Sequence, residues 1–161
     1  MRAVIQRVTQ ASVTVGDELV SRIQAGLLVL LGIAAQDSEA DADWMLDKLV
    51  DMRIFEDEAG RFDRSLRDTG GELLVVSQFT LLADTRKGRR PSFTDAAQPA
   101  HAIPLYERFA SRARDQGIQT ATGRFGARMA VQLVNDGPVT IVLDSREWAQ
   151  PRTEHAESRR V

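Results

Sequence analysis

Cysteine is absent from this 161-residue sequence, and histidine occurs only twice, as His101 and His155. Without cysteine the chain has no disulfide, no thiolate metal ligand and no thiol nucleophile. The two histidines do not stand at a spacing typical of metal ligands, so the sequence predicts no zinc site. Few residues are left that could complete a catalytic triad. These absences leave little room for chemistry that depends on thiol or imidazole groups.

Long apolar runs are also missing. The longest, residues 26–35, is about half of the ~20 residues that a membrane-spanning helix needs. Polar residues interrupt the apolar ones over residues 1–8, which is not the pattern of a signal peptide. We therefore expect a cytoplasmic protein that has no membrane partner.

Neither sign of charge dominates, because 21 lysines and arginines face 23 acidic residues and the formal net charge is -2. A chain with this balance has no global positive field that would attract a polyanion. Any contact with nucleic acid should therefore be local, such as a strand end rather than a long duplex. A basic cluster in the segment 86–90 is either a solvated loop or a contact to phosphates, and both readings stay open.

What the chain does have is the composition of an ordinary globular protein, with 43% hydrophobic and 27% charged residues. Its length suits one well-buried core better than two. We expect a single domain over residues 1–145. The remaining residues, 146–161, are charged and aperiodic, so we expect a flexible tail whose start is pinned by Trp148.

Hydrophobic spacing predicts a chain that alternates between strands and helices. Expected strands are 4–15, 18–23, 27–33, 73–82, 118–122, 129–134 and 139–144. Helices are expected after Ser38, which is a plausible N-cap, and over 105–116, while 61–71 and 83–99 are expected to be loops. Because hairpin signals favour antiparallel pairing, the prediction is the α+β class with a mainly antiparallel, barrel-like sheet and two main helices.

The segment 134–140, Val-Asn-Asp-Gly-Pro-Val-Thr, stands between two of these expected strands. Asn-Asp-Gly is strong hairpin chemistry, but a proline directly after it cannot donate to a strand ladder. Gly137 offers bare backbone and Pro138 fixes φ, so the pair can present carbonyl oxygens rigidly at a tip. A plain hairpin turn with a trans proline is the simpler alternative.

A second unusual run is Ser77-Gln78-Phe79-Thr80, which ends the apolar segment 73–76. It places hydroxyl, amide and aromatic groups where a strand would simply continue. A serine and threonine at the end of a strand are more often structural than catalytic, so the run alone does not establish a site.

Several stretches, in order along the chain, match one family. They are Met1–Val8, Ile54–Asp57, Ser77–Thr80, Lys87–Phe93, Gly123–Ala127, Met129 and Asn135–Thr140. With them the chain resembles the D-aminoacyl-tRNA deacylases from Met1 to about Asp144. Two loops depart from the common pattern of that family: 61–64, where it often has a lysine and an asparagine, and 87–90, which is richer in arginine here. Both departures concern peripheral tRNA contacts more than the chemistry.

The resemblance implies a hydrolase that cleaves the ester joining a D-amino acid to the 3′-terminal adenosine of tRNA, and so proofreads chirality. It implies a homodimer with the active site at the subunit interface, and neither a metal nor an organic cofactor. Glycyl-tRNA is an expected second substrate, because glycine has no side chain that a chiral filter could reject.

The resemblance also assigns roles to individual positions. The scissile ester would lie beside a catalytic segment made of Ser77, Gln78, Phe79 and Thr80. A cis pair, Gly137 and Pro138, would reach into the partner's site and hold the substrate's α-amino group with its carbonyls, so that an L side chain collides. Arg7 would fix that pair. Phe125 and Met129 would lie near the terminal adenine, although for a generic protein each is more readily explained as core.

Thr80 could be a nucleophile, but nothing near it in sequence can act as the base that a threonine hydroxyl needs. We therefore favour attack by water, helped by the substrate's ribose 2′-hydroxyl, with the backbone amides around Phe79 and Thr80 stabilising the oxyanion. Two rival readings remain: a noncatalytic module that binds RNA 3′ ends, and a structural dimer whose Gly-Pro tip seals an interface. Turnover of D- and L-aminoacyl-tRNA separates them.

Overall fold

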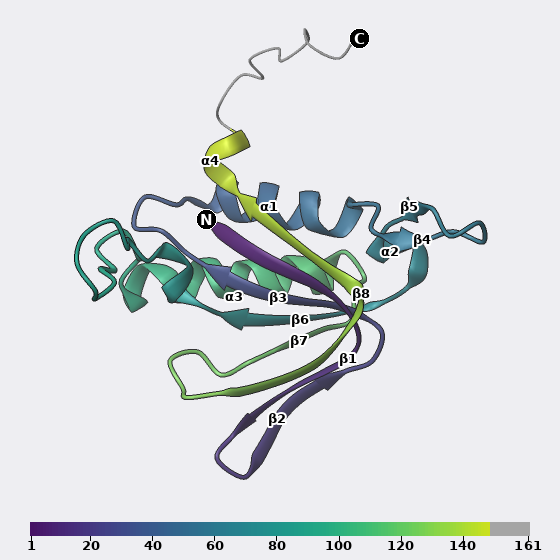
Figure 1. Ribbon diagram of the computed structural model, residues 1–161, viewed down its shortest axis with the longest axis horizontal. Coiled ribbons are helices and arrows are strands. Elements are labelled where there is room, and N and C mark those ends of the chain that lie inside the picture. Colours follow the sequence, from purple (N-terminus) through teal and green to yellow (C-terminus); the bar gives the residue numbers. More distant parts are fainter. Residues whose placement is uncertain (149–161) are drawn as a thin grey trace, which may run out of the picture.

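The computed structural model describes residues 1–148, and a curved sheet of six strands forms its centre (Figure 1). Across the sheet the order is β2-β1-β3-β6-β7, and β8 pairs with β1. The strands of this sheet are β1 (Arg2–Val15), β2 (Glu18–Ile23), β3 (Gly26–Gly32), β6 (Glu72–Ser77), β7 (Thr120–Thr122) and β8 (Ala130–Asp144). A separate two-stranded sheet contains β4 (Phe55–Glu56) and β5 (Phe62–Arg64). The helices are α1 (Glu39–Asp51), α2 (Leu66–Thr69), α3 (Pro99–Asp115), α4 (Ser145–Trp148) and the 3-10 helix η1 (Phe79–Leu82).

The sheet is mixed. β1 pairs antiparallel with β2, β3 and β8, whereas β3 with β6 and β6 with β7 are parallel. The parallel pairs arise because α1 and α3 carry the chain back between consecutive strands of the sheet, as parallel pairing requires. β2 curls round to approach β6 and β7, so the sheet is nearly a closed barrel. The predicted α+β class is confirmed, while the sheet has more parallel pairing than the hairpin signals suggested.

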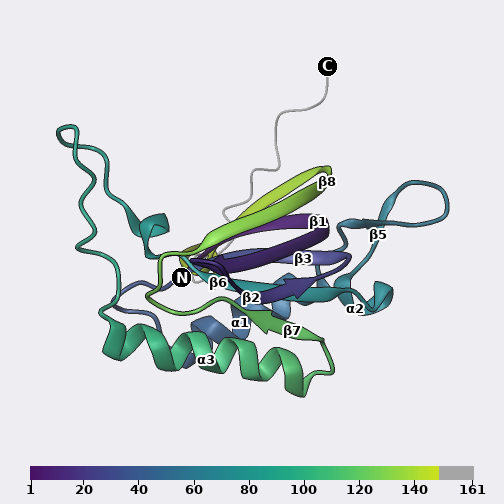
Figure 2. The same ribbon diagram turned by 90° about the horizontal axis from the view of Figure 1, so that it is seen from below.

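The two long helices cover one face of the sheet (Figure 2), and they are the two main helices that the sequence predicts. Ser38 caps α1 in a reciprocal capping box with Asp41, as its sequence pattern indicates. Apolar side chains of α1 and α3 meet those of β1, β3 and β6 in one buried cluster that includes Leu46 and Phe109. Within residues 1–148, no helix combines the length and the apolar character needed to cross a membrane.

The α-amino group of Met1 is buried and joins three segments of the chain. It donates to Asp37 Oδ1 at 2.6 Å and to Ser145 Oγ at 2.8 Å. α4 begins at Ser145, so the first residues of the expected tail are helical. Trp148 stacks on Trp44 of α1 with ring centroids 5.7 Å apart. Trp148 thus packs against α1 at the start of the expected tail, and the rest of that tail lies outside the described residues.

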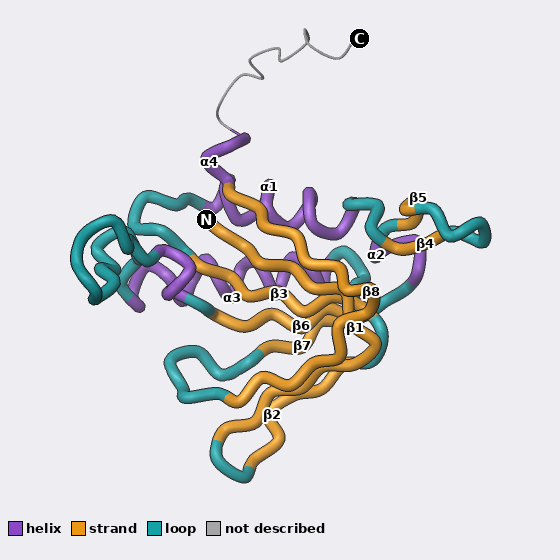
Figure 3. Tube along the Cα trace, in the orientation of Figure 1, coloured by secondary structure: helices purple, strands orange, loops and turns teal. Residues whose placement is uncertain are grey.

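The predicted hairpin at 135–137 is wrong, because β8 continues through this segment as one bent strand (Figure 3). β8 pairs with β1 on both sides of the bend, and Val8 faces Asn135 while Gln6 faces Thr140. Residues 136–139 are left out of this register, which makes a wide bulge. Asn135 supplies the missing ladder bonds with its side chain: Oδ1 accepts from the Val139 N–H at 2.7 Å and Nδ2 donates to the Val139 carbonyl at 3.0 Å.

Three other boundaries also differ from the prediction. The expected strand 73–82 ends at Ser77, where the chain turns into η1. The expected loop 61–71 contains β5 and the one-turn helix α2, which Ser65 caps. α3 begins at Pro99 rather than at residue 105, because Pro99 occupies the first turn and Pro104, still near the start, interrupts few backbone bonds.

Candidate active site

A cavity of about 520 Å³ opens where β6 ends. Its main walls are the Ser77–Phe79 segment, residues 96–99 at the start of α3, residues 125–127 and 129 of the β7–β8 connection, and Val131 of β8. The last sheet bond on this side is the one that the Gln78 N–H donates to the Leu31 carbonyl at 2.8 Å. After Gln78, η1 turns the chain out of the sheet, and the strand ends. The sheet thus places the predicted polar segment at the mouth of a ligand-sized cavity.

Among the described residues that line this cavity, none carries an acidic, basic or imidazole side chain. Of the two histidines, His101 lies elsewhere and its Nε2 is 2.8 Å from the Asp37 carbonyl oxygen, a structural contact. Within residues 1–148 there is also no group of three or more histidine, cysteine or carboxylate side chains that could hold a metal ion. The polar groups that the cavity does offer are hydroxyl, amide and main-chain groups.

The start of η1 supplies two of these main-chain groups. The first N–H groups of a helix have no acceptor within that helix, and here they belong to Phe79 and Thr80. The Gln78 amide donates to Thr80 Oγ1, so the threonine hydroxyl oxygen already has a neutral partner and no base. The arrangement can donate hydrogen bonds to a developing oxyanion more readily than it can generate an alkoxide.

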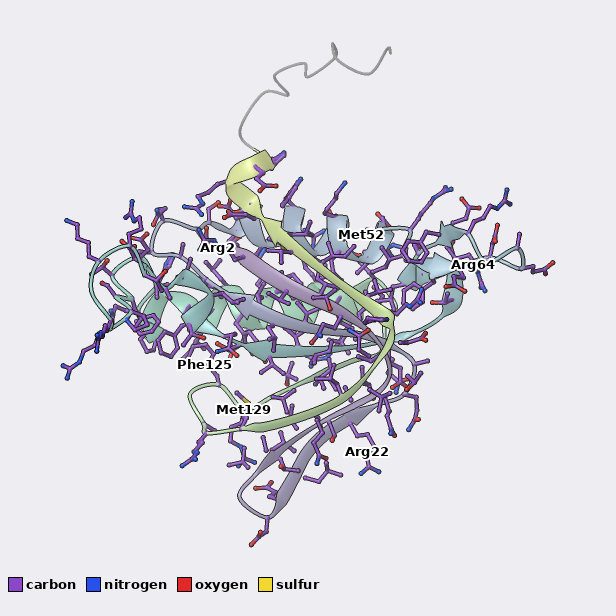
Figure 4. The ribbon with its side chains drawn as sticks, viewed as in Figure 1. Arg2, Arg22, Met52, Arg64, Phe125 and Met129 are labelled. Atoms are coloured by element: carbon purple, nitrogen blue, oxygen red, sulfur yellow. The ribbon has the colours of Figure 1, made fainter. Side chains whose placement is uncertain are left out.

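Apolar side chains form the inner wall of the cavity. Phe125 and Met129, labelled in Figure 4, both come from the connection between β7 and β8. Gly123 makes room for the methionine, because a Cβ at this position would lie 2.7 Å from Met129 Sδ. At the mouth, Phe79 meets Phe93 edge to face with ring centroids 5.1 Å apart. Both Phe125 and Met129 are half-buried, so they pack on the core and face the cavity at once.

Tyr106 of α3 supports this wall from behind. Its ring meets Phe125 edge to face with centroids 5.7 Å apart, and its hydroxyl donates to the Val75 carbonyl at 2.8 Å. Burial disfavours the phenolate and raises the pKa of Tyr106 to about 12. This residue therefore fixes Phe125 while it remains neutral.

Tyr106 is the only tyrosine of the chain, so its ionisation can be followed directly by tyrosinate absorbance. The tyrosine of the folded protein should titrate with a midpoint near 12, and that of the chain in denaturant should titrate near the ordinary tyrosine pKa of 10.0. Since the folded pKa is the higher one, the stability that the neutral ring contributes is complete below pH 10 and declines as the pH rises toward 12. Equal midpoints for the two states would contradict the buried position of the ring.

The other predicted pair, Gly137 and Pro138, lies at the bend of β8, and the peptide bond between them is cis. Both residues are exposed, and Gly137 has φ +138. Arg7 holds the bend from inside the sheet: it is 5% exposed, and its Nε donates to the Asp136 carbonyl at 3.0 Å. We refer to residues 136–138 as the tip.

The structure therefore divides the predicted site residues into two groups. The cavity brings together Ser77, Gln78, Phe79, Phe125 and Met129, with Thr80 adjoining through Gln78. Arg7 and the tip are not among its lining residues. Figure 1 shows the bend of β8 at the side of the sheet that carries β4 and β5, whereas η1 and the β7–β8 connection lie at the opposite side.

Sequence reasoning missed one wall of the cavity, formed by residues 96–99. The available signal was a proline after Gln98 at the first position of a helix, which would have placed the start of α3, and hence this wall, beside the end of β6. It also missed Phe62, whose ring lies over Arg7 with Cζ 5.4 Å from the ring centroid.

Comparison with known proteins supports the resemblance to the D-aminoacyl-tRNA deacylases over nearly the whole chain. A family model described as D-Tyr-tRNA(Tyr) deacylase matches residues 4–144. A Roseiflexus sp. (strain RS-1) protein named D-aminoacyl-tRNA deacylase is 63% identical over 155 residues, which is 96% of this chain and 100% of that protein. A Thermus aquaticus protein of the same name is 56% identical over 147 residues, covering 91% of this chain and 97% of the relative.

Two solved structures share the fold. One, called c-Myc DNA Unwinding Element Binding Protein, superposes with a TM-score of 0.84 at 43% identity and covers 89% of this chain and 98% of that one. The other, described as a probable eukaryotic D-amino acid tRNA deacylase, gives a TM-score of 0.78 at 21% identity over 88% of this chain and 97% of its own. At that identity, the second likeness speaks for the fold alone.

Proposed function

The chain belongs to the D-Tyr-tRNA(Tyr) deacylase family, and from this we propose that its cavity and its tip are the two halves of one stereoselective centre. It is a D-aminoacyl-tRNA deacylase, a hydrolase that cleaves the ester between a D-amino acid and tRNA. The observation that carries the proposal is the Ser77–Phe79 segment at the mouth of a cavity without titratable side chains. Such a cavity suits a substrate whose own ester needs main-chain hydrogen bonds rather than a protein base.

In the proposed complex, the 3′-terminal adenosine of tRNA enters the cavity. Its volume of about 520 Å³ is within the usual range for small-molecule sites. Phe125 and Met129 offer an apolar wall for the base, and stacking of an aromatic side chain on an unpaired base is worth ~1–3 kcal/mol. The ester then lies at the cavity mouth beside Gln78 and Phe79.

For the hydrolytic step we favour water as the nucleophile, assisted by the ribose 2′-hydroxyl of the substrate. The water oxygen bonds to the ester carbon, and the carbonyl oxygen becomes an oxyanion. Collapse breaks the bond to the ribose 3′-oxygen, which takes up the proton that water loses by way of the 2′-hydroxyl, so the D-amino acid and the 3′-hydroxyl of tRNA are released. The N–H groups of Phe79 and Thr80 are placed to receive the oxyanion, and one such donor is typically worth ~3–4 kcal/mol. No cofactor enters this scheme.

The separation of the cavity and the tip on one chain supports a homodimer in which each tip serves the cavity of the other copy. In that arrangement the exposed carbonyls of Gly137 and Pro138 accept hydrogen bonds from the substrate's α-amino group. A D side chain then points away from the tip, whereas an L side chain meets it. Such a filter reads only the α-carbon, so it accepts D residues of many kinds and also glycyl-tRNA.

The exposed loop 86–90 is a candidate contact for the acceptor stem. Arg86 is paired with Asp84 at 2.7 Å, which leaves Lys87, Arg89 and Arg90 as the charges that can face phosphates. The loop leads directly into Phe93 at the cavity mouth, so phosphates near the 3′ end lie within its reach.

An enzyme that acts on aminoacyl-tRNA is expected to work in the cytoplasm.

A turnover assay tests the proposed function. Purified protein is mixed with D-, L- and glycyl-tRNA carrying labelled amino acids, and release of the amino acid is followed. We expect cleavage of the D and glycyl esters and survival of the L ester. Binding of tRNA without cleavage would favour the noncatalytic RNA 3′-end module, and absence of both would favour the structural dimer.

Thr80→Ala should keep most of the activity. The variant loses only the hydrogen bond from Gln78 to the hydroxyl, so kcat for D-aminoacyl-tRNA should fall by at most about tenfold. Removal of a true nucleophile costs roughly 10⁴-fold or more. Single-turnover kinetics with acid quenching is the measurement. Complete loss of turnover in a folded variant, or an acyl-enzyme trapped on the wild type, would establish covalent catalysis instead.

A further inference from the structure

The guanidinium of Arg7 joins the tip to the small sheet of β4 and β5. On one side, its Nε donates to the Asp136 carbonyl at 3.0 Å and lies 3.4 Å from the carboxylate of the same residue. On the other side, its Nη1 donates to the Ile54 carbonyl at 2.8 Å, just before β4. Its Nη2 lies 3.6 Å from Glu56 Oε1. One planar group therefore carries contacts to two segments that are remote in sequence.

Phe62 completes this arrangement from β5. It is the register partner of Glu56, so the two side chains reach Arg7 from neighbouring strands. The Arg7 Cζ lies 5.4 Å from the centroid of the Phe62 ring, a distance at which a cation is attracted to the face of an aromatic ring. The ring is 53% exposed, yet the Arg7 side chain beneath it is only 6% exposed. The ring thus covers the guanidinium while its other side faces outward.

The position of this guanidinium matters for the tip. A Cβ at Gly137 would lie 3.4 Å from Arg7 Nη2, an ordinary van der Waals distance, so the guanidinium lies beside Gly137. A small shift of the guanidinium is passed to the start of the tip through its hydrogen bond to the Asp136 carbonyl. A leucine in place of Phe62 could fill space at this point but could not attract the cation.

We propose that Phe62 is a positioning residue for stereoselection: its ring holds the Arg7 guanidinium in place, so that the β4–β5 hairpin sets the position of the tip. Phe62 is not among the residues that line the cavity, and in this proposal it acts through Arg7. The proposal rests on the proposed function, because it assigns the tip its role in choosing D over L substrates.

Substitution at Phe62 tests this role. Phe62→Leu removes the aromatic face and keeps an apolar side chain, and Phe62→Tyr keeps the face. We expect Phe62→Leu to lower the ratio of kcat/KM for D- over L-aminoacyl-tRNA by roughly tenfold. Phe62→Tyr should keep the ratio of the wild type. Leu19→Ala removes an exposed apolar side chain on β2 and should leave the ratio unchanged. Thermal unfolding of each variant shows that the fold is intact.

A double-mutant cycle separates an effect through Arg7 from an independent one. In an Arg7→Gln background, Phe62→Leu should have no further effect on the ratio, because the cation that the ring holds is gone. Three results would each overturn this inference and leave the proposed function standing: additive losses, equal losses in the leucine and tyrosine variants, or full selectivity in Phe62→Leu. A wild-type protein without D-specific turnover would overturn the proposed function and the inference with it.

Discussion

Gly137→Ala is expected to lower kcat/KM for D-aminoacyl-tRNA by roughly 10²-fold and to erase the preference for D over L substrates. Gly137 has φ +138, where a residue with a Cβ is strained. That Cβ would also lie 2.7 Å from Val139 Cγ2 and 2.9 Å from the Val139 backbone nitrogen. The bend of β8 must therefore shift, and the carbonyls of the tip shift with it. The measurement is the initial rate of ester cleavage with matched D and L substrates.

Gly16→Ala is the matched control for this variant. Gly16 also has positive φ, at +57, but a Cβ there meets nothing within 4 Å. Gly16→Ala carries the backbone cost of a left-handed residue, about 1–2 kcal/mol, and no clash of its Cβ, so it reports on backbone strain without a displaced tip. Unchanged D-specific cleavage by Gly137→Ala would count against a main-chain filter at this position.

After Gly137→Ala, Arg7→Lys should cause the largest loss of activity. Lysine keeps the positive charge but lacks the fork that reaches the carbonyls of Asp136 and Ile54 together. One buried acceptor then loses its donor, which typically costs about 1–3 kcal/mol of stability. The tip also loses its anchor, so we expect kcat/KM for the D substrate to fall by roughly 10–100-fold.

Thermal unfolding and D and L turnover, measured on the same samples, check the Arg7→Lys prediction. Arg108→Lys is a suitable control, because Arg108 also makes a two-pronged contact, with the Asp43 carboxylate, but on α3 and away from the tip. The control should lose little selectivity. Wild-type selectivity in Arg7→Lys, together with a normal melting temperature, would show that the fork is not what fixes the tip.

Local patterns predicted well those elements whose boundaries depend on neighbouring residues. α1 begins after Ser38 because the capping box with Asp41 is written within four consecutive positions. The hairpin of β1 and β2 needs only alternating residues and the turn at Gly16. Such features are complete in a short stretch of sequence, so tertiary structure does not overrule them.

The errors arose where a distant segment decides the outcome. Asn-Asp-Gly has the chemistry of a hairpin, but pairing with β1 on both sides keeps β8 running on, and the Asn135 side chain replaces the missing ladder bonds. Parallel pairing of β3 with β6 also depends on where α1 returns the chain, which no local pattern states. Phe62 looked like part of a polar loop because its partner, Arg7, is on another strand.

The site residues came from the family resemblance more than from residue chemistry. Composition and spacing alone left Ser77 and Thr80 as structural candidates, and Phe125 as core. The resemblance assigned them to one centre with Gly137 and Pro138. Geometry then adds a spatial reason for the sharing between two chains that the resemblance implies, because on one chain the cavity and the tip lie at opposite sides of the sheet.

This outward-facing tip changes how damage is distributed in a pair of chains. In the proposed arrangement, a copy with a defective tip still has an intact cavity, and the tip of a wild-type partner can complete it. The healthy partner's own cavity, in contrast, receives the ruined tip and is lost. A mixed pair therefore keeps one working centre of its two, and a faulty allele weakens proofreading of handedness in proportion to its share of the chains.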